Sequence, residues 1–347
     1  MYIGNRQIGA DVAPFIIAEM SGNHNQSLDR ALQIVDAAAA TGADAVKLQT
    51  YTPDTITLNI RTDDFKIADE KSLWKGRNLH DLYRDAHTPW EWHKPIMERA
   101  RSHGMICFSS PFDETAVDFL EDLDVPAYKI ASFENIHIPL LKKVALTRKP
   151  LIVSTGMASI SEIDEVVETV RENNGGDLIL LKCTSTYPAT PKDSNILTIP
   201  HMKSLFRCEI GLSDHTMGVG VAIAAIAHGA TVIEKHFTLS RAEGGVDSTF
   251  SLEPQEMTNL VVEAQRAWQS LGDISYGPTA AEEKSLAFRR SIYVAKDIAA
   301  GDILTHENLR IVRPAFGLAP KHYDLLIGRQ AIRDTKAGTP ATWGLIM

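Results

Sequence analysis

Short runs rich in valine, isoleucine and leucine recur between residues 15 and 237, and stretches with helical periodicity separate most of them. This alternation is typical of βα units arranged around a parallel sheet. The runs number eight, which predicts an α/β fold of the (β/α)8 TIM-barrel type. They occupy residues 15–19, 45–50, 105–110, 127–132, 151–155, 178–184, 209–214 and 232–237.

The pattern changes after residue 272. Residues 273–285 lack a periodic apolar pattern and are predicted to be a linker. Residues 286–347 contain short alternating segments punctuated by glycine, aspartate and proline, which predict a small β-rich domain. We therefore expect a barrel domain over residues 1–272, in which the chemistry lies, followed by this small domain.

The composition limits the partners of the chain. The formal net charge is −9 and the isoelectric point is near 5.7, which argues against a nucleic-acid or anionic-membrane surface. No apolar run is long enough for a transmembrane helix, and the first residues do not resemble a secretory signal. Cys107, Cys183 and Cys208 form no CxxC pair and are expected to be reduced core residues. We expect a cytoplasmic protein with no nucleic-acid and no membrane partner.

Polar side chains gather at the carboxyl ends of the predicted strands, where the active sites of such barrels lie. Four of them are lysines, which predicts a positively charged well suited to a phosphate or carboxylate ligand. The alternative is a buried ionic network of lysines with Glu19, Asp214 and Glu234 that only fills the barrel. The polar residues are Glu19, Lys47, Gln49, Ser109, Ser110, Lys129, Ser132, Ser154, Thr155, Lys182, Thr184, Ser185, Ser213, Asp214, His215, Glu234, Lys235 and His236.

Two of these residues, His215 and His236, end adjacent predicted strands. Two imidazoles with open positions for water and substrate would hold a divalent cation as a Lewis acid. The alternative for either histidine is an ordinary hydrogen-bonded role. Side chains alternate along a strand, so Glu234 and His236 are expected on one face and Lys235 on the other.

The residues after the first predicted strand read "SGNHNQSLDRA". One interpretation is an active-site loop with Asn23 and His24 facing the barrel mouth. The other is a loop that leads into a helix capped by Asn25 or Ser27.

Many motifs in order give the chain a resemblance to a known family. They include "AEMSGNHN", "ADAVKLQTY", "YKIASFE", "KCTSTYPA", "GLSDHT", "IEKHFTLSR" and "GVDSTFSLEP". Together they resemble the sialic acid synthase family, whose members condense phosphoenolpyruvate with an acylated amino sugar. The C-terminal stretch "RRSIYVAKDIAAGDILT" resembles the antifreeze-like (SAF) domain of that family. Within the family, "AEMSGNHNQSL" and "LWKGRNLHDLYRDAHTPWEWH" are most similar to the pseudaminic acid branch.

The resemblance implies a transferase and a role for individual residues. Catalysis is expected from Glu19, Glu234, His215 and His236, with the two histidines as ligands of Mn²⁺ or Mg²⁺. The implied phosphoenolpyruvate site consists of Lys129, Ser132, Ser154, Ser185, Ser213 and one of Ser109 or Ser110. The implied sugar site consists of Glu19, Lys47, Gln49, Glu134, Tyr187, Asp247 and Arg313. In the family, the arginine that Arg313 matches reaches the barrel of the other subunit in a domain-swapped homodimer.

Other functions fit parts of the same pattern. An N-acetylneuraminate or legionaminic acid synthase would use the same mechanism on another sugar. A Schiff-base aldolase or lyase would use a barrel lysine as its nucleophile, with Lys182 as the candidate. A non-catalytic carbohydrate-binding protein is suggested by the antifreeze-like C-terminal stretch.

Overall fold

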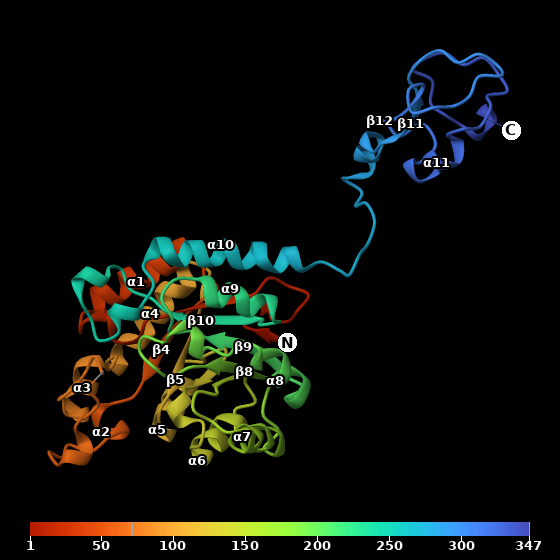
Figure 1. The fold of residues 1–347 in the computed structure, drawn as a ribbon. Coiled ribbons are helices and arrows are strands. Elements are labelled where there is room, and N and C mark those ends of the chain that lie inside the picture. Colours follow the sequence, from red (N-terminus) through yellow and green to blue (C-terminus); the bar gives the residue numbers. More distant parts are fainter. Residues whose placement is uncertain (71, 347) are drawn as a thin grey trace. The chain divides into compact units, whose positions relative to one another are not determined.

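The computed structural model describes residues 1–70 and 72–346, within which eight parallel strands close into a barrel (Figure 1). The predicted fold class is therefore confirmed, and the ends of the predicted strands differ from the observed ones by at most two residues. In ring order the strands are β10 (Val232–His236), β3 (Phe15–Glu19), β4 (Ala45–Thr50), β5 (Ile106–Pro111), β6 (Tyr128–Ile130), β7 (Leu151–Ser154), β8 (Leu178–Cys183) and β9 (Glu209–Ser213).

Amphipathic helices surround the barrel (Figure 1). In α7, for example, Ile163, Val166 and Val170 are buried on one face, and a capping box between Ser159 and Glu162 starts the helix. Within the described residues, no helix combines the length and the apolar character needed to span a bilayer. The outer helices are α1 (Leu28–Thr41), α4 (Trp90–Ser102), α5 (Glu114–Asp122), α6 (Ile138–Leu146), α7 (Ile160–Glu172), α8 (Thr198–Phe206), α9 (Gly220–Ala227) and α10 (Pro254–Leu271).

The interior of the barrel is apolar at the amino ends of the strands and polar at their carboxyl ends. At the amino ends of the strands, inward side chains such as Phe15, Phe108 and Ile152 form an apolar cluster. A hairpin of β1 (Tyr2–Ile3) and β2 (Arg6–Gln7) precedes the barrel, and Ile3 packs into the same cluster. The polar inward side chains are thus confined to the carboxyl ends of the strands, as expected for a barrel with a binding site.

A long excursion separates β4 from α4. We call residues 53–70 and 72–86 the β4–α4 segment; it contains α2 (Pro53–Ile56) and α3 (Leu79–Ala86). Figure 1 shows α2 and α3 together on the side of the barrel away from the N-terminus. The segment is therefore an addition to the regular βα repeat, of the kind that often carries function in such barrels.

The chain divides into two compact units, Met1–Gly272 and Asp273–Met347. In the second unit β11 (Ser291–Val294) pairs with β12 (Leu309–Val312) in an antiparallel sheet, followed by the short helix α11 (Tyr323–Leu326). Ile292, Leu309 and Leu326 belong to a separate apolar core. The small β-rich C-terminal domain is thus confirmed, while the exact bounds of the linker at residues 273–285 remain a prediction.

Two of the four strand lysines do not point into the barrel, so the predicted four-lysine well is wrong. The Lys235 side chain lies on the outer face of β10, where Nζ donates to Asp214 Oδ2 (2.9 Å) and to the carbonyl oxygens of Thr216 (2.6 Å) and Gly218 (2.9 Å). Lys182 Nζ donates to the carbonyl oxygen of its neighbour Cys183 (2.8 Å). Strand alternation explains both, because Lys182 and Lys235 follow the inward-facing Leu181 and Glu234.

Lys235 should matter for stability, because its removal leaves Asp214 as a buried carboxylate without its cation. We expect Lys235→Met to lower the free energy of unfolding by about 3–5 kcal/mol. Lys143→Met is the matched control, since Lys143 pairs with the exposed Asp118 at the surface and should cost about 1 kcal/mol at most. Urea unfolding of both variants measures the difference; equal costs would contradict a structural role for Lys235.

Candidate active site

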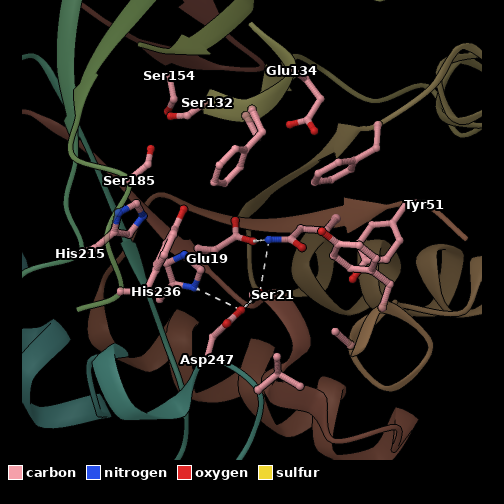
Figure 2. Close-up of a pocket in the computed structure, with 18 of the residues that line it drawn as sticks. Glu19, Ser21, Tyr51, Ser132, Glu134, Ser154, Ser185, His215, His236 and Asp247 are labelled. Atoms are coloured by element: carbon pink, nitrogen blue, oxygen red, sulfur yellow. Dashed lines mark hydrogen bonds and ion pairs between the residues drawn. The ribbon is translucent and has the colours of Figure 1, made fainter. Parts of the chain in front are cut away.

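A cavity of about 520 Å³ lies at the carboxyl ends of the barrel strands (Figure 2). Its size is that of a small-molecule site. Fourteen of the predicted site residues line it, contributed by the strands and by the loops that follow them. They are Glu19, Lys47, Gln49, Lys129, Ser132, Glu134, Ser154, Ser185, Tyr187, Ser213, His215, Glu234, His236 and Asp247.

A buried network of alternating charges forms the floor of this cavity. Lys47 Nζ contacts a carboxylate oxygen of Glu19 and lies 3.9 Å from Glu234 Oε2. Lys129 Nζ lies 3.6 Å from Glu234 Oε1, which also accepts a hydrogen bond from Ser213 Oγ (3.0 Å). All five residues are buried, so each charge depends on its neighbours rather than on water.

The two carboxylates of this network differ in proton affinity. Burial raises the pKa of Glu19 to about 7, and Lys47 only partly opposes this effect. Burial also acts to raise the pKa of Glu234, but Lys129 and Lys47 together outweigh it and hold the pKa below its usual value. At neutral pH, Glu234 therefore carries a charge while Glu19 can both accept and release a proton. Two carboxylates whose pKa values differ in this way can take different roles in acid–base chemistry.

Hydroxyl groups from neighbouring strand ends form a cradle on another side of the cavity. Ser132 Oγ accepts from the Gly156 backbone N–H (3.1 Å). The approach is so close that a Cβ at Gly156 would lie 2.1 Å from Ser185 Oγ and 2.7 Å from Ser132 Oγ. Ser154 Oγ is buried and, among the described residues, has no hydrogen-bond partner. Hydroxyls in a cavity that Lys129 also lines suit the oxygens of an anionic ligand.

His215 and His236 face the same cavity, with ring centroids 5.4 Å apart. His215 Nδ1 donates to the carbonyl oxygen of Thr184 (2.9 Å), and the same side chain contacts the Cys183 thiol. His236 Nδ1 is buried, 3.9 Å from Asp247 Oδ2, and has no hydrogen-bond partner in the described part of the chain. Burial lowers the pKa of His236 well below its usual value, so this imidazole is neutral.

These two imidazoles fit a divalent cation, because His236 presents a neutral ring with an unpartnered nitrogen and His215 faces the same cavity beside it. Over residues 1–70 and 72–346, no group of three or more histidine, cysteine, aspartate or glutamate side chains is arranged to hold a metal ion. Water and substrate oxygens would therefore have to complete the coordination, which is the arrangement of an open, catalytic site rather than a structural one.

Cys183 is buried as predicted, but it also lines the cavity, so it is more than a core residue. Burial acts to raise the pKa of its thiol, yet contact with His215 outweighs burial and lowers the pKa to about 7. Burial likewise acts to lower the pKa of His215, and Cys183 outweighs it and raises that pKa. Cys183 follows the inward-facing Leu181 by two residues, and this spacing was the signal for its orientation.

Three predicted residues lie elsewhere. Ser109 Oγ bonds Thr50 Oγ1 (2.6 Å), which in turn bonds His93 of α4, so Ser109 faces the helices. Ser110 Oγ accepts from Lys47 Nζ (3.2 Å) but is fully buried and does not line the cavity. Arg313 belongs to the second unit and is exposed there, so its role stays a prediction.

The loop after β3 also differs from its active-site interpretation. Asn23 Nδ2 donates to the carbonyl oxygen of Phe237 (2.9 Å), and His24 is fully buried with its pKa lowered by burial to about 4. Neither lines the cavity, so the expectation that both face the mouth is wrong. The capping interpretation is confirmed, because Ser27 Oγ accepts from the Arg30 N–H at the start of α1.

Ser21 also lines the cavity, although no motif or spacing in the sequence predicted it. Its backbone has a φ of +48°, an unusual value for a side-chain-bearing residue. Ser21 Oγ bonds Asp247 and accepts from Gln49 Nε2 (3.3 Å), and Gln49 also donates to Glu19 Oε1 (3.0 Å). Figure 2 shows Ser21 next to Asp247, from where this chain of contacts leads to Glu19.

Comparison with known proteins shows which sequences and structures this chain resembles. The model of the NeuB family matches residues 34–276, and that of the SAF domain matches residues 289–347. A pseudaminic acid synthase of Campylobacter jejuni is 46% identical over 97% of both chains. One of Helicobacter pylori is 41% identical over 94% of this chain and 96% of its own. The crystal structure of an N-acetylneuraminic acid (sialic acid) synthetase from Leptospira borgpetersenii, in complex with citrate, has a TM-score of 0.73 and 32% identity, covering 82% of this chain and 94% of its own.

Glu134, on the rim of the cavity, should make stability depend on pH. Burial raises its pKa from 4.5 to about 7, so between these values the folded state binds more protons than the unfolded state and stability falls as pH rises. Replacing it in Glu134→Gln should make this fall shallower when urea unfolding is measured from pH 4.5 to 7.5. Phe133→Leu, next to it and exposed, changes no titrating group and serves as control. An unchanged slope in Glu134→Gln would contradict the prediction.

Proposed function

Because the chain belongs to the NeuB family, we propose that it is a pseudaminic acid synthase. It condenses phosphoenolpyruvate with 2,4-diacetamido-2,4,6-trideoxy-L-altrose and water, and it releases phosphate by C–O cleavage. The relatives from Campylobacter and Helicobacter support the choice of product. The structural observation that carries the proposal is the meeting, in one cavity, of a hydroxyl cradle with Lys129 and a pair of imidazoles.

The substrates would divide the cavity between them. Phosphate and carboxylate oxygens of phosphoenolpyruvate suit the cradle and its lysine, which carry donors where the ligand carries charge. The sugar would lie toward the Glu19 side. We assign Lys129, Ser132, Ser154, Ser185 and Ser213 to phosphoenolpyruvate, and Lys47, Gln49, Glu134, Tyr187 and Asp247 to the sugar.

His215 and His236 would hold the divalent cation, Mn²⁺ or Mg²⁺. When bound, such an ion supplies Lewis-acid polarisation of a carbonyl oxygen. The protein itself contributes two buried rings, one of them fixed by the hydrogen bond from His215 Nδ1 to Thr184. That bond fixes the orientation of the His215 ring, and a second contact of this kind tunes ligand histidines.

Of the two carboxylates, Glu234 would stabilise positive charge and Glu19 would transfer protons. A bond forms between carbon 3 of phosphoenolpyruvate and the aldehyde carbon, and positive charge develops at carbon 2, where the ionised Glu234 can stabilise it. Water then adds to carbon 2 and gives a proton to Glu19, which can pass it to the new alkoxide oxygen. The C–O bond to phosphate breaks with its electrons on phosphate, which takes the remaining hydroxyl proton and leaves a ketone.

The competing functions receive less support. A Schiff-base enzyme would need Lys182 in the cavity, but its amine donates to the backbone of Cys183 and does not line that cavity. A protein that only binds carbohydrate would have no use for buried ions, which are costly to maintain. An N-acetylneuraminate or legionaminic acid synthase would share the mechanism, so the choice of acceptor needs a direct test.

We also propose that the protein works in the cytoplasm as a domain-swapped homodimer. In this arrangement, Arg313 of one subunit would bind the sugar at the barrel of the other. The acidic composition and the family resemblance support this proposal.

The first test measures phosphate release from phosphoenolpyruvate with three acceptors: the diacetamido-trideoxy-altrose, its legionaminic-pathway mannose counterpart, and N-acetylmannosamine. We expect release with the altrose, and its loss in excess chelator with recovery on added Mn²⁺ or Mg²⁺. Release with another acceptor instead would keep the mechanism and correct the sugar. No release with any acceptor in the presence of metal would reject the proposed function.

Arg313→Ala tests the contribution of the second unit. Loss of a charged hydrogen bond to the sugar should lower kcat/KM for the acceptor about 10- to 100-fold, with an unchanged KM for phosphoenolpyruvate. Arg310→Ala, at another exposed arginine of the same unit, is the matched control and should behave as wild type. Unchanged sugar kinetics with Arg313→Ala would remove this residue from the site.

A further inference from the structure

The β4–α4 segment gives the cavity an apolar wall, which the mechanism above does not use. We define this wall as Ile56, Ile67, Leu79 and Leu82, all of which line the cavity. Leu82 is buried and the other three are half-buried. The strand ends, by contrast, contribute mostly charges and hydroxyls. In Figure 2 Tyr51, where the chain leaves β4 for this segment, lies across the pocket from His215 and Ser185.

Contacts within and beyond the segment hold the wall in place. The Ile67 N–H donates to the carbonyl oxygen of Arg77 (3.0 Å), and the Asn78 side chain accepts from the His80 N–H at the start of α3. Trp74 Nε1 donates to the carbonyl oxygen of Val246 (3.0 Å), which ties the segment to the loop after β10. The wall therefore exists before a ligand arrives, and binding need not order it.

The four wall side chains themselves carry no hydrogen-bonding group. Ser72 Oγ accepts from the Trp74 N–H (3.2 Å), and the Trp74 indole N–H is used by Val246. A hydroxyl pressed against Ile56, Ile67, Leu79 and Leu82 would lose its water without gaining an equivalent partner. A methyl group at the same point would bury apolar surface and gain contacts.

The reaction fixes which end of the acceptor meets this wall. The aldehyde carbon has to lie at the strand ends, beside the imidazoles and Glu19. Carbon 6 is the opposite end of the open sugar chain, so it points away from the strand ends and toward the elements that complete the cavity. The wall is thus the surface that carbon 6 would meet.

We propose that the apolar wall of the β4–α4 segment receives the carbon-6 methyl group of a 6-deoxy acceptor and selects it over sugars with a hydroxymethyl end. This inference rests on the proposed function, because it assumes that an aldehyde sugar reacts at the strand ends. An apolar pocket discriminates against an added hydroxyl by about 100-fold. The wall thereby determines acceptor specificity, while the strand ends determine the reaction.

The test compares two acceptors that differ at one atom, 2,4-diacetamido-2,4,6-trideoxy-L-altrose and its 6-hydroxy analogue, with the full-length protein and saturating phosphoenolpyruvate. Wild type should prefer the deoxy sugar about 100-fold in kcat/KM. Leu79→Asn should shrink this preference about 10-fold, with the KM for phosphoenolpyruvate unchanged. Ile67→Thr is a milder change in the same wall and should act in the same direction. It still decides the question if Leu79→Asn does not fold.

Leu58→Asn is the matched control, because Leu58 lies in the same segment but is 56% exposed and does not line the cavity. It should keep the wild-type preference. Equal use of the two sugars by wild type, or an equal loss on both sugars in Leu79→Asn and Ile67→Thr, would overturn the inference while the synthase activity stands. Absence of phosphate release with every acceptor would instead reject the proposed function, and the inference with it.

Discussion

Lys47 is the ion on which the arrangement of the site depends. It lies between Glu19 and Glu234, and Lys129 lies on the far side of Glu234, so charges of opposite sign alternate across the barrel interior. Each ion is buried and none could be removed without leaving a neighbour uncompensated. Because β3 pairs with both β4 and β10, the register Glu19↔Lys47 and Glu19↔His236 fixes these side chains at one level of the barrel. Strand register therefore sets the geometry of the chemistry.

The two glutamates differ in pKa because of their neighbours and not because of their residue type. Glu234 has two lysines and the Ser213 hydroxyl within reach, so its pKa falls although it is buried. Burial and the negative charge of Glu234 raise the pKa of Glu19 to about 7, and its contact with Lys47 opposes this rise only in part. The same network thus holds one carboxylate ionised and leaves the other able to exchange a proton near neutral pH. A two-step addition needs both behaviours, and a single isolated carboxylate would provide one of them.

Strand alternation explains which parts of the site could be predicted from the sequence. The eight apolar runs identified the barrel, and the shared parity of Glu234 and His236 correctly put both in the cavity. The rule also correctly predicted that Lys235 lies on the opposite face, but it was not applied to Lys182, and counting lysines at strand ends without their parity predicted a well of four. Ser21 was beyond such rules, because its position depends on a left-handed backbone and on a partner, Asp247, 226 residues away. Contacts of this kind are fixed by the folded loops and leave no periodic pattern.

The periodicity of the sequence did not predict that the β4–α4 segment lines the cavity, since its apolar residues Ile56, Ile67, Leu79 and Leu82 are spread over short elements without a common period. Their convergence on the cavity comes from tertiary contacts. This division has a consequence for how the site can vary. Strand residues are constrained by the ion network, whereas the four wall residues are not part of that network. Changes in the segment can therefore alter the acceptor without disturbing proton transfer. Trp74 is where the two parts meet, because its indole N–H bonds Val246, the residue before Asp247. Trp74 therefore links the wall, which would set acceptor choice, to the loop that carries Asp247 into the cavity.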